Sequence, residues 1–271
     1  SGTSIPASAV YAKCDMPHIT ASASNPDLTK PGHKTTFRLI ANDNALGAAL
    51  ALFGADHLKI KTVAIIDDRT AYGQGVASVF KATALQKGVK IVGEEFTNDK
   101  ATDFMAILTS IKNKKPDAIF YGGLDAQAGP MLRQMEQLGL SGVKYFGGDA
   151  LCTEKLPELA SKTQALKNVT CATGGASVDK MQGGADWKKR YDAKFPGQFQ
   201  IYSPYAYDAT MVLADAMKRA NSVDPKVFNA FISKTDYKGV TANIAFTSKG
   251  ELTTPAVTLY TYKDGRRVAL N

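Results

Sequence analysis

Short apolar runs alternate with amphipathic stretches between residues 62 and 173, and this alternation constrains the fold more than any other feature. The run "TVAIID" is apolar and rich in β-branched residues, as is typical of a strand buried in a parallel sheet. The stretch after it places Val76, Phe80 and Ala84 on one face of a helix. Such alternation forms βαβ crossovers, so we predict an α/β fold with mostly parallel sheets. The predicted strands are residues 62–67, 89–96, 117–123, 144–150 and 168–173, with helices at 103–114 and 126–140.

The two ends of the chain are less regular but continue the α/β pattern. Upstream, we expect a helix that starts near Pro6, strands in residues 16–22 and 35–43, and a helix that carries Leu46 and Leu50. Downstream, we expect helices in residues 186–195, 205–220 and 224–234 and strands in residues 241–246 and 256–262.

Composition and charge exclude several classes of protein. Apolar residues make up 44% of the chain and charged residues 21%, which is typical of a globular protein. No apolar run reaches the ~20 residues that a membrane-spanning helix needs. The formal net charge is +8, but the basic residues are scattered and no aromatic residues alternate with them. This pattern favours a solvated basic surface over nucleic-acid binding.

The three cysteines, Cys14, Cys152 and Cys171, form no CxxC motif of a metal or redox site. Cys152 and Cys171 flank residues 154–166, which we expect to form one helix. A disulfide between them would close a loop of about 20 residues and stabilise the fold by roughly 3 kcal/mol. Spacing alone leaves this bridge and a pair of free buried thiols equally open. Cys14 is then expected to be unpaired on a buried helix face.

Polar segments follow the predicted strands, where parallel α/β sheets bind their ligands. These segments are residues 22–24, 68–72, 121–125 and 147–149. The sequence contains no P-loop and no nucleophile elbow, and its three histidines lie in unrelated contexts without metal-ligand spacing. We therefore expect a binding protein, with no enzymatic activity, cofactor or metal.

One motif supports an alternative from another class of function. The stretch "GQGVAS" (Gly73–Ser78) is close to the dinucleotide fingerprint, and Glu94 lies about 20 residues further on. However, Ser78 stands in place of the third glycine, and the motif does not follow its strand directly. An NAD-dependent oxidoreductase is thus the alternative, and a helix start with small residues is the structural explanation.

A set of stretches occurs in order over essentially the whole chain: "SGTSIPASAVYAKCDMPHITASASNPDLT", "FRLIANDNALGAALA", "VAIIDDRTAYGQG", "DAIFYGG", "MLRQMEQLGL" and "YFGGDA". This set resembles the periplasmic branched-chain amino-acid (Leu/Ile/Val) binding proteins, the substrate-binding components of ABC importers. The resemblance implies a periplasmic protein, its leader removed, that captures a small amino acid by hinge closure and presents it to a membrane permease. It implies neither membrane insertion nor nucleic-acid binding. Another small amide or an aromatic acid is the alternative ligand on the same fold.

The resemblance also implies a type I periplasmic binding fold, with two lobes, each a mostly parallel sheet flanked by helices. Lobe one is expected to hold residues 1–42 and 172–254, and lobe two residues 43–171 and 255–271. Three crossings join them, near Ala41–Asn42, Cys171–Ala172 and Thr254–Pro255. Family members have a further βα stretch ahead of the position that matches Ser1, so the N-terminal strands of lobe one are expected to be missing here.

The same resemblance implies four ligand-binding residues in lobe one. Ser1 and Ser24 match the positions whose hydroxyl and amide groups bind the ligand carboxylate. Ser22 matches the position whose backbone carbonyl accepts from the ligand ammonium. Tyr202 lies where this lobe approaches the ligand, although it and Tyr205 are equally consistent with core positions. For Ser22 and Ser24, an ordinary turn before Pro26 is the structural alternative.

Three more ligand-binding residues are implied in lobe two. Tyr72 matches a tyrosine that closes over the ligand and excludes water. Asp149 matches an acidic residue that pairs with the ligand ammonium, since a buried unpaired ion is costly; capping of the following turn is its structural alternative. Leu124 takes a position that is aromatic in some members, so the wall of the side-chain pocket is expected to be aliphatic here.

Overall fold

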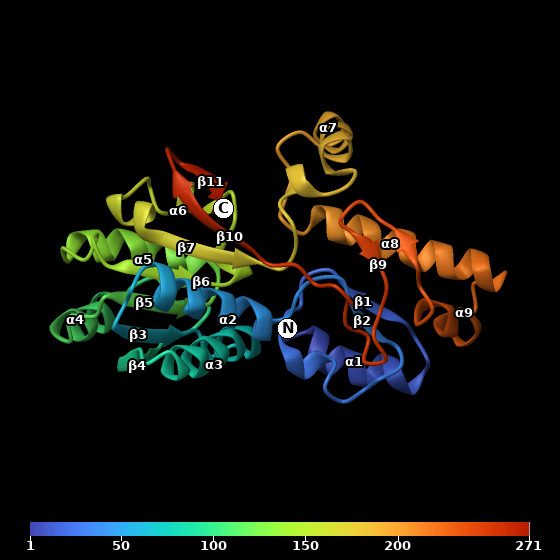
Figure 1. The fold of residues 1–271 in the computed structure, drawn as a ribbon, viewed down its shortest axis with the longest axis horizontal. Coiled ribbons are helices and arrows are strands. Elements are labelled where there is room, and N and C mark those ends of the chain that lie inside the picture. The colour runs from blue at the N-terminus through green and yellow to red at the C-terminus, as the bar shows by residue number, and fades with distance from the viewer. Residues whose placement is uncertain (271) are drawn as a thin grey trace. The chain divides into compact units, whose positions relative to one another are not determined.

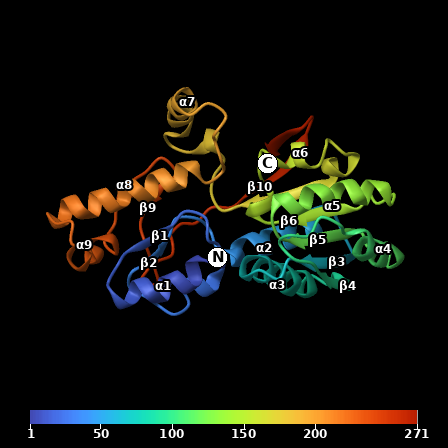
Figure 2. The same ribbon diagram turned by 180° about the vertical axis from the view of Figure 1, so that it is seen from behind.

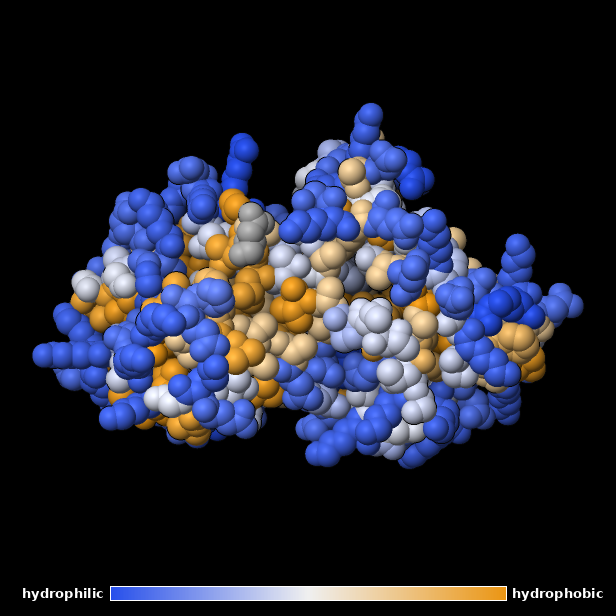
Figure 3. Space-filling view, viewed as in Figure 1, coloured by the Kyte–Doolittle hydropathy of each residue, from blue (hydrophilic) through white to orange (hydrophobic). Residues whose placement is uncertain are grey.

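The computed structural model describes residues 1–270, which form two compact units (Figures 1 and 2). Within the described residues, no helix is both long enough and apolar enough to cross a bilayer. Figure 3 shows hydrophilic side chains spread over the visible face of each unit. Unit 1 comprises Ser1–Asn42 and Gly174–Ala256, and unit 2 comprises Asp43–Thr173 and the segment that begins at Val257.

The chain passes from one unit to the other three times, after Asn42, Thr173 and Ala256. The last two passages fall two residues after the expected crossings. The reason is the pairing of β7 (Val169–Thr173) with β10 (Thr258–Lys263), whose register includes Thr173 opposite Thr258 and keeps both strands in unit 2.

Unit 2 is built on one sheet with the strand order β11-β10-β7-β6-β5-β3-β4. The strands from β7 to β4 are parallel, and β10 and β11 add antiparallel pairs at the β7 edge. This architecture confirms the predicted α/β fold with a mostly parallel sheet. The remaining strands are β3 (Thr62–Asp67), β4 (Lys90–Phe96), β5 (Ala118–Gly122), β6 (Lys144–Gly147) and β11 (Arg266–Ala269).

Helices cover both faces of this sheet because successive strand side chains point to opposite faces. Val63 and Ile65 belong to the buried cluster formed with α2 (Asp43–Leu52) and α3 (Ala71–Gln86). Ala64 and Ile66 belong to the cluster formed with α4 (Met105–Asn113) and α5 (Asp125–Gln137). The carboxyl ends of the parallel strands, where the predicted residues of this unit lie, therefore stand between two packed layers.

Unit 1 contains the parallel pair β1 (His18–Thr20) and β2 (Thr36–Arg38) and a short antiparallel pair, β8 and β9. Phe37 and Leu39 pack in one buried cluster with Val212 of α8 and Phe228 of α9. Figure 2 shows these helices beside the β1–β2 pair. The other bounds are α1 (Ser4–Lys13), α7 (Gly184–Lys194), α8 (Ser203–Ala220), α9 (Pro225–Ile232), β8 (Tyr237–Lys238) and β9 (Asn243–Ile244).

The prediction of one helix over residues 154–166 is wrong. The structure has a single turn of helix, α6 (Leu156–Leu159), and then a 3₁₀-helix, Gln164–Asn168. Ser161 and Lys162 between them have φ values of 50° and 56°, in the left-handed region. Because an α-helix cannot continue through two left-handed residues, the helix ends there and a separate 3₁₀-helix follows.

The structure shows how the three cysteines are paired and where Cys14 lies. Cys152 and Cys171 form a disulfide. Of the two alternatives that the spacing left open, the bridge is therefore correct and the pair of free thiols is not. It ties the end of the 3₁₀-turn Asp149–Leu151 to β7. Cys14 is exposed at the C-terminal end of α1, not buried on a helix face as predicted, because α1 ends one residue before it.

Candidate functional site

In unit 1, the structure brings Ser1 and the loop after β1 together. The Thr20 hydroxyl accepts hydrogen bonds from the backbone N–H groups of Ser22 (3.3 Å) and Ala23 (2.9 Å), which turns the chain at the end of the strand. The backbone N–H of Asn25 donates to Ser1 Oγ at 3.2 Å. The hydroxyl of Ser1 therefore lies against the backbone of the Ala23–Asn25 loop.

Ser24 is the most buried of the predicted serines. It has no exposed surface, and its hydroxyl makes no hydrogen bond with any residue that the structure describes. Buried hydroxyls in native proteins are hydrogen-bonded, and leaving one without a partner is costly. A ligand group that supplies the partner at Ser24 would remove this cost. Ser22, by contrast, is exposed, and only its backbone takes part in the turn.

The sequence interpretation missed the residue that holds this loop. Arg38, in β2, is fully buried and donates hydrogen bonds to the backbone carbonyls of Ala23 and Asn25. It also pairs with Glu251, with Nε and Oε2 3.0 Å apart. A charged residue inside the apolar run "TTFRLI" was the signal, because arginine is almost never fully buried unless it is paired.

Tyr202 lies immediately before α8 and is half-buried. One turn further on, Tyr205 is buried and packs in a cluster with Ile40 and Ala21. The start of α8 thus lies near Ala21, the residue that precedes Ser22. Gly175 leaves room for the Tyr205 ring, since a Cβ on residue 175 would lie 1.6 Å from Tyr205 Oη. Tyr205 is accordingly a core residue of unit 1.

In unit 2, the structure brings Tyr72 and Asp149 together. Tyr72 lies in the first turn of α3, and its hydroxyl accepts a hydrogen bond from the backbone N–H of Ala150 at 3.1 Å. Asp149 precedes Ala150 at the start of a 3₁₀-turn after β6 and is only 1% exposed. Gly148 allows the tyrosine to come close, because a Cβ at this position would lie 2.5 Å from Tyr72 Oη.

The turn before Tyr72 is fixed by its own side chains. Asp68 Oδ1 accepts hydrogen bonds from the backbone N–H (2.9 Å) and the hydroxyl (2.6 Å) of Thr70. The Thr70 hydroxyl in turn accepts from the N–H of Gly73 at 2.9 Å and caps α3. Asp68 is almost fully buried, and this burial raises the pKa of its carboxyl group above the ordinary value.

The glycine that suggested a dinucleotide fingerprint has a packing role. A Cβ on Gly73 would lie 2.4 Å from the carbonyl oxygen of Gly122, at the end of β5. Glycine is therefore needed for α3 to pack closely against this strand. Within the described residues, no group of three or more His, Cys, Asp or Glu side chains could hold a metal ion.

Leu124 lies at the start of α5, after β5, and is 40% exposed. The next residue, Asp125, accepts a hydrogen bond from the hydroxyl of Thr153 at 2.6 Å. This bond links the start of α5 to the segment that follows Asp149 and Cys152. Leu124 thus belongs to the same edge of the unit 2 sheet as Tyr72 and Asp149.

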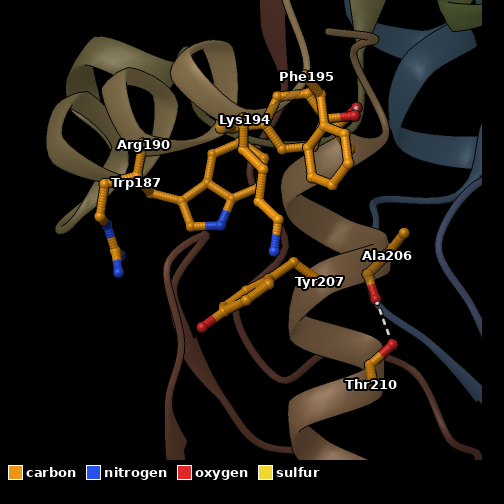
Figure 4. A pocket seen from close by; sticks show the side chains of 9 residues that line it. Trp187, Arg190, Lys194, Phe195, Ala206, Tyr207 and Thr210 are labelled. Carbon is orange, nitrogen blue, oxygen red and sulfur yellow. Dashed lines mark hydrogen bonds between the residues drawn. The ribbon is translucent and has the colours of Figure 1, made fainter. Parts of the chain in front are cut away.

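A pocket of about 660 Å³ lies elsewhere in unit 1, between α7 and α8 (Figure 4). Aromatic side chains form much of its lining, with Arg190 and Lys194 at its edge. None of the residues predicted to bind the ligand lines it. The lining residues are Trp187, Arg190, Tyr191, Lys194, Phe195, Ser203, Ala206, Tyr207 and Thr210.

Comparison with known proteins places this architecture in a family. The family described as "Periplasmic binding protein" matches residues 1–267. A Leu/Ile/Val-binding protein homologue from Brucella suis is 33% identical over 267 residues, which cover 98% of this chain and 70% of the relative. A leucine-, isoleucine-, valine-, threonine- and alanine-binding protein from Pseudomonas aeruginosa is 28% identical, over 98% of this chain and 71% of the relative.

Solved structures agree with the relatives. A leucine-binding protein, LivK, from Thermotoga maritima superposes with a TM-score of 0.90 at 25% identity, over 99% of this chain and 76% of that protein. A branched-chain amino-acid transporter substrate-binding protein, LivJ, from Streptococcus pneumoniae, solved with isoleucine, has the same fold, with a TM-score of 0.87 at 24% identity. The superposition covers 100% of this chain and 77% of LivJ. The predicted resemblance is thereby confirmed, and the chain belongs to the periplasmic binding protein family.

Proposed function

We propose that the protein binds a branched-chain amino acid between its two lobes and passes it to an ABC importer. The observation that carries this proposal is the buried hydroxyl of Ser24, which has no partner among the described residues and belongs to the loop whose Asn25 N–H bonds Ser1 Oγ. Membership in a family of binding proteins removes the dinucleotide-dependent enzyme from consideration.

In this proposal, unit 1 binds the α-carboxylate of the ligand. The hydroxyls of Ser1 and Ser24 and the backbone N–H groups of their loop donate to its oxygens, which suits an anion. The backbone carbonyl of Ser22 accepts from the ammonium. These assignments match the local geometry, because the N–H of Asn25 already bonds Ser1 Oγ and holds the two segments together.

Unit 2 supplies the negative charge for the ligand ammonium and an aromatic ring that shields the ligand from water. The Asp149 carboxylate pairs with the ammonium, and Tyr72 closes over the ligand. The bond between the Tyr72 hydroxyl and the Ala150 N–H keeps these two residues next to each other. Leu124 and Tyr202 contact the ligand side chain. Aliphatic contact at Leu124 favours leucine, isoleucine or valine over a polar side chain.

The names of the relatives support this ligand class, since proteins that bind leucine, isoleucine and valine occur among them. We propose further that the protein works in the periplasm and that a membrane permease recognises its closed form. Ligand binding would close the lobes only to the extent that the closed form binds the amino acid more tightly than the open form.

A calorimetric titration tests the proposed function. Leucine, isoleucine and valine are titrated into the purified protein that carries this chain, with NAD and an aromatic acid such as benzoate as comparison ligands. We expect saturable binding of at least one branched-chain amino acid and no heat from NAD. Binding of benzoate but of no amino acid would replace the amino-acid ligand with an aromatic acid, and binding of NAD alone would overturn the proposal.

A further inference from the structure

We propose that Arg38 is a positioning residue of the ligand site, which acts on the ligand only through the Ala23–Asn25 loop. This inference rests on the proposed function for the ligand, although the constraint on the loop can be measured without one. The sequence resemblance includes Arg38 in one of its stretches but assigns it no role. Within the described residues, its hydrogen bonds go to backbone carbonyls, Thr29 and Glu251, and not to a predicted ligand-binding side chain.

The guanidinium group clamps the backbone on both sides of Ser24. Its Nη1 donates to the carbonyl of Ala23, and its Nη2 donates to the carbonyl of Asn25 at 3.0 Å. Ser24 is the single residue between these two carbonyls. The rigid fork of one arginine therefore sets the distance between the peptide groups that flank the unpartnered hydroxyl.

A second layer of contacts holds the guanidinium itself. Glu251 accepts from Arg38 Nε at 3.0 Å and from Nη2 at 3.1 Å, and Glu251 Oε1 also accepts from the hydroxyl of Thr29 at 2.5 Å. Glu251 follows a tight turn whose Gly250 has a φ of +76° and packs against the carbonyl of Thr36. A Cβ on Gly250 would lie 2.0 Å from that oxygen, so the turn can deliver Glu251 to β2 only with glycine there.

The contacts of the Arg38 guanidinium indicate that this residue positions the loop and does not bind the ligand directly. The guanidinium has five N–H groups, and its nitrogens already serve two carbonyls, the Glu251 carboxylate and the Thr29 hydroxyl. Its charge is balanced by Glu251, and its side chain has no exposed surface. Arg38 is thus committed to the loop and, being fully buried, has no open access for a ligand carboxylate.

Arg38→Lys is the informative variant. Lysine keeps the positive charge for Glu251, but a single ammonium cannot reproduce the fork that spans two carbonyls. We expect the dissociation constant for leucine to rise about tenfold, as for the loss of one or two hydrogen bonds. Arg38→Ala is avoided because it would leave the half-buried Glu251 without the charge that pairs with it.

A double-mutant cycle with Ser24→Ala gives a readout that a merely structural role would not move. If Arg38 acts through Ser24, the double variant binds leucine within about twofold of the weaker single variant, because one lost contact cannot be lost twice. Multiplicative losses in the double variant, or a lower melting temperature with an unchanged dissociation constant, would show a structural role alone and overturn the inference.

Amide hydrogen exchange tests the clamp in the absence of ligand. In Arg38→Lys, the amides of residues 23–25 should exchange at least about tenfold faster than in the wild type, since the loop opens more often. Unchanged exchange overturns the inference whether or not the protein binds leucine. If exchange rises but the wild type binds no amino acid, the proposed function fails and the clamp stands as a feature of the loop.

Arg219→Lys is the matched control in the same unit. Arg219 also pairs with a carboxylate, with Nε 2.7 Å from Asp215 Oδ2, and donates to a backbone carbonyl, that of Phe231, at 2.9 Å. It lies at the other end of α8, away from the Ala23–Asn25 loop. We expect unchanged leucine affinity and unchanged exchange of residues 23–25 in this variant; an equal loss in it would overturn the specific role of Arg38.

Discussion

Among single residues, Asp149 matters most to the proposed function, because its carboxylate is proposed to pair with the ligand ammonium. Asp149 as a residue is only 1% exposed, so its side chain is already removed from bulk water. The Tyr72–Ala150 hydrogen bond holds the neighbouring backbone in place. An ammonium group of a ligand would meet a carboxylate that is already desolvated and fixed.

Asp149→Asn keeps the shape of the side chain and removes its charge. Because a buried ammonium would then lose its counter-charge, which costs about 3–5 kcal/mol, we expect leucine affinity to fall by roughly 10²- to 10³-fold. Isothermal titration calorimetry measures the change. Asp264→Asn, at an exposed turn of the same unit, is the control and should bind as the wild type does. An unchanged dissociation constant in Asp149→Asn would remove Asp149 from the site.

Asp68 gives a prediction for the pH dependence of stability. Burial raises the pKa of its carboxyl group in the folded protein above 3.8, so the folded state binds the proton more tightly than the unfolded state. The stabilising contribution of this group is therefore fully present below the unfolded pKa and is lost as the pH rises through the folded pKa.

Asp68→Asn should remove that loss, because the amide oxygen can still accept from Thr70 while the side chain stays neutral. Urea unfolding at a series of pH values between 3 and 8 compares the variant with the wild type. We expect the free energy of unfolding of the variant, relative to the wild type, to increase as the pH rises through the folded pKa. A constant difference at all pH values would contradict the prediction.

Two contacts between elements determine how the carboxyl edge of unit 2 is assembled. The first turn of α3 lies against the end of β5, where Gly73 meets Gly122. The disulfide ties the turn after Asp149 to β7. Both contacts lie next to residues of the candidate site. A substitution that breaks either contact should therefore lower the stability of unit 2 and displace the side chains proposed to bind the ligand.

Gly73→Ala should destabilise unit 2 strongly. The new Cβ would lie 2.4 Å from the Gly122 carbonyl and 2.2 Å from Asp68 Oδ1, so the helix must move away from the strand. We expect a loss of about 1–3 kcal/mol in the free energy of unfolding, measured with urea. Gly142→Ala, which has open space around its new Cβ, should stay within about 0.5 kcal/mol of the wild type. Equal effects at both positions would be inconsistent with a packing role.

Replacement of both Cys152 and Cys171 by alanine should lower the free energy of unfolding by about 3 kcal/mol. The two cysteines are 19 residues apart, and the bridge restricts the unfolded chain over that loop. The urea midpoint of the double variant measures the loss. Cys14→Ala is the control, because Cys14 is free and exposed. If the two variants unfold at the same midpoint, the disulfide contributes nothing to stability.

The molecule as a whole is two units joined by three passages of the chain. This connectivity suits hinge motion, because the hinge can lie in short segments while both cores stay intact. Under the proposed function, addition of saturating leucine should reduce the radius of gyration measured by small-angle X-ray scattering. The Asp149→Asn variant at the same leucine concentration, below its own dissociation constant, should keep the radius of the free protein. No change in the wild type on saturation would argue against closure.

Much of this fold could be predicted because the apolar runs of unit 2, such as "TVAIID", are short, rich in β-branched residues and alternate with helical stretches, as buried parallel strands do. The strand β11 was missed because it contains Arg266 and Arg267, which hide its pattern; Arg267 pairs with Glu154 instead of facing a core. The break at Ser161 and Lys162 was missed because neither residue type marks a left-handed conformation.

The candidate site was predicted less completely than the fold. Side chains such as Ser24 and Asp149 lie after strands and could be placed at a carboxyl edge from the sequence alone, and their roles toward a ligand stay predictions. Arg38 could not be assigned to the loop, because Ala23 and Asn25 reach it through the β1–β2 pairing and Glu251 through the turn at Gly250. Long-range hydrogen bonds of this kind leave no local pattern in a sequence.

The exposed thiol at the end of α1 has a practical consequence. Because the other two cysteines are joined to each other, Cys14 offers one attachment point for a maleimide dye in the unreduced protein. The label would sit on the unit that contains the Ala23–Asn25 loop, without any engineered substitution. These 271 residues can therefore be labelled at one site for fluorescence or single-molecule measurements, provided that handling avoids oxidation that would couple two molecules through the Cys14 sulfur.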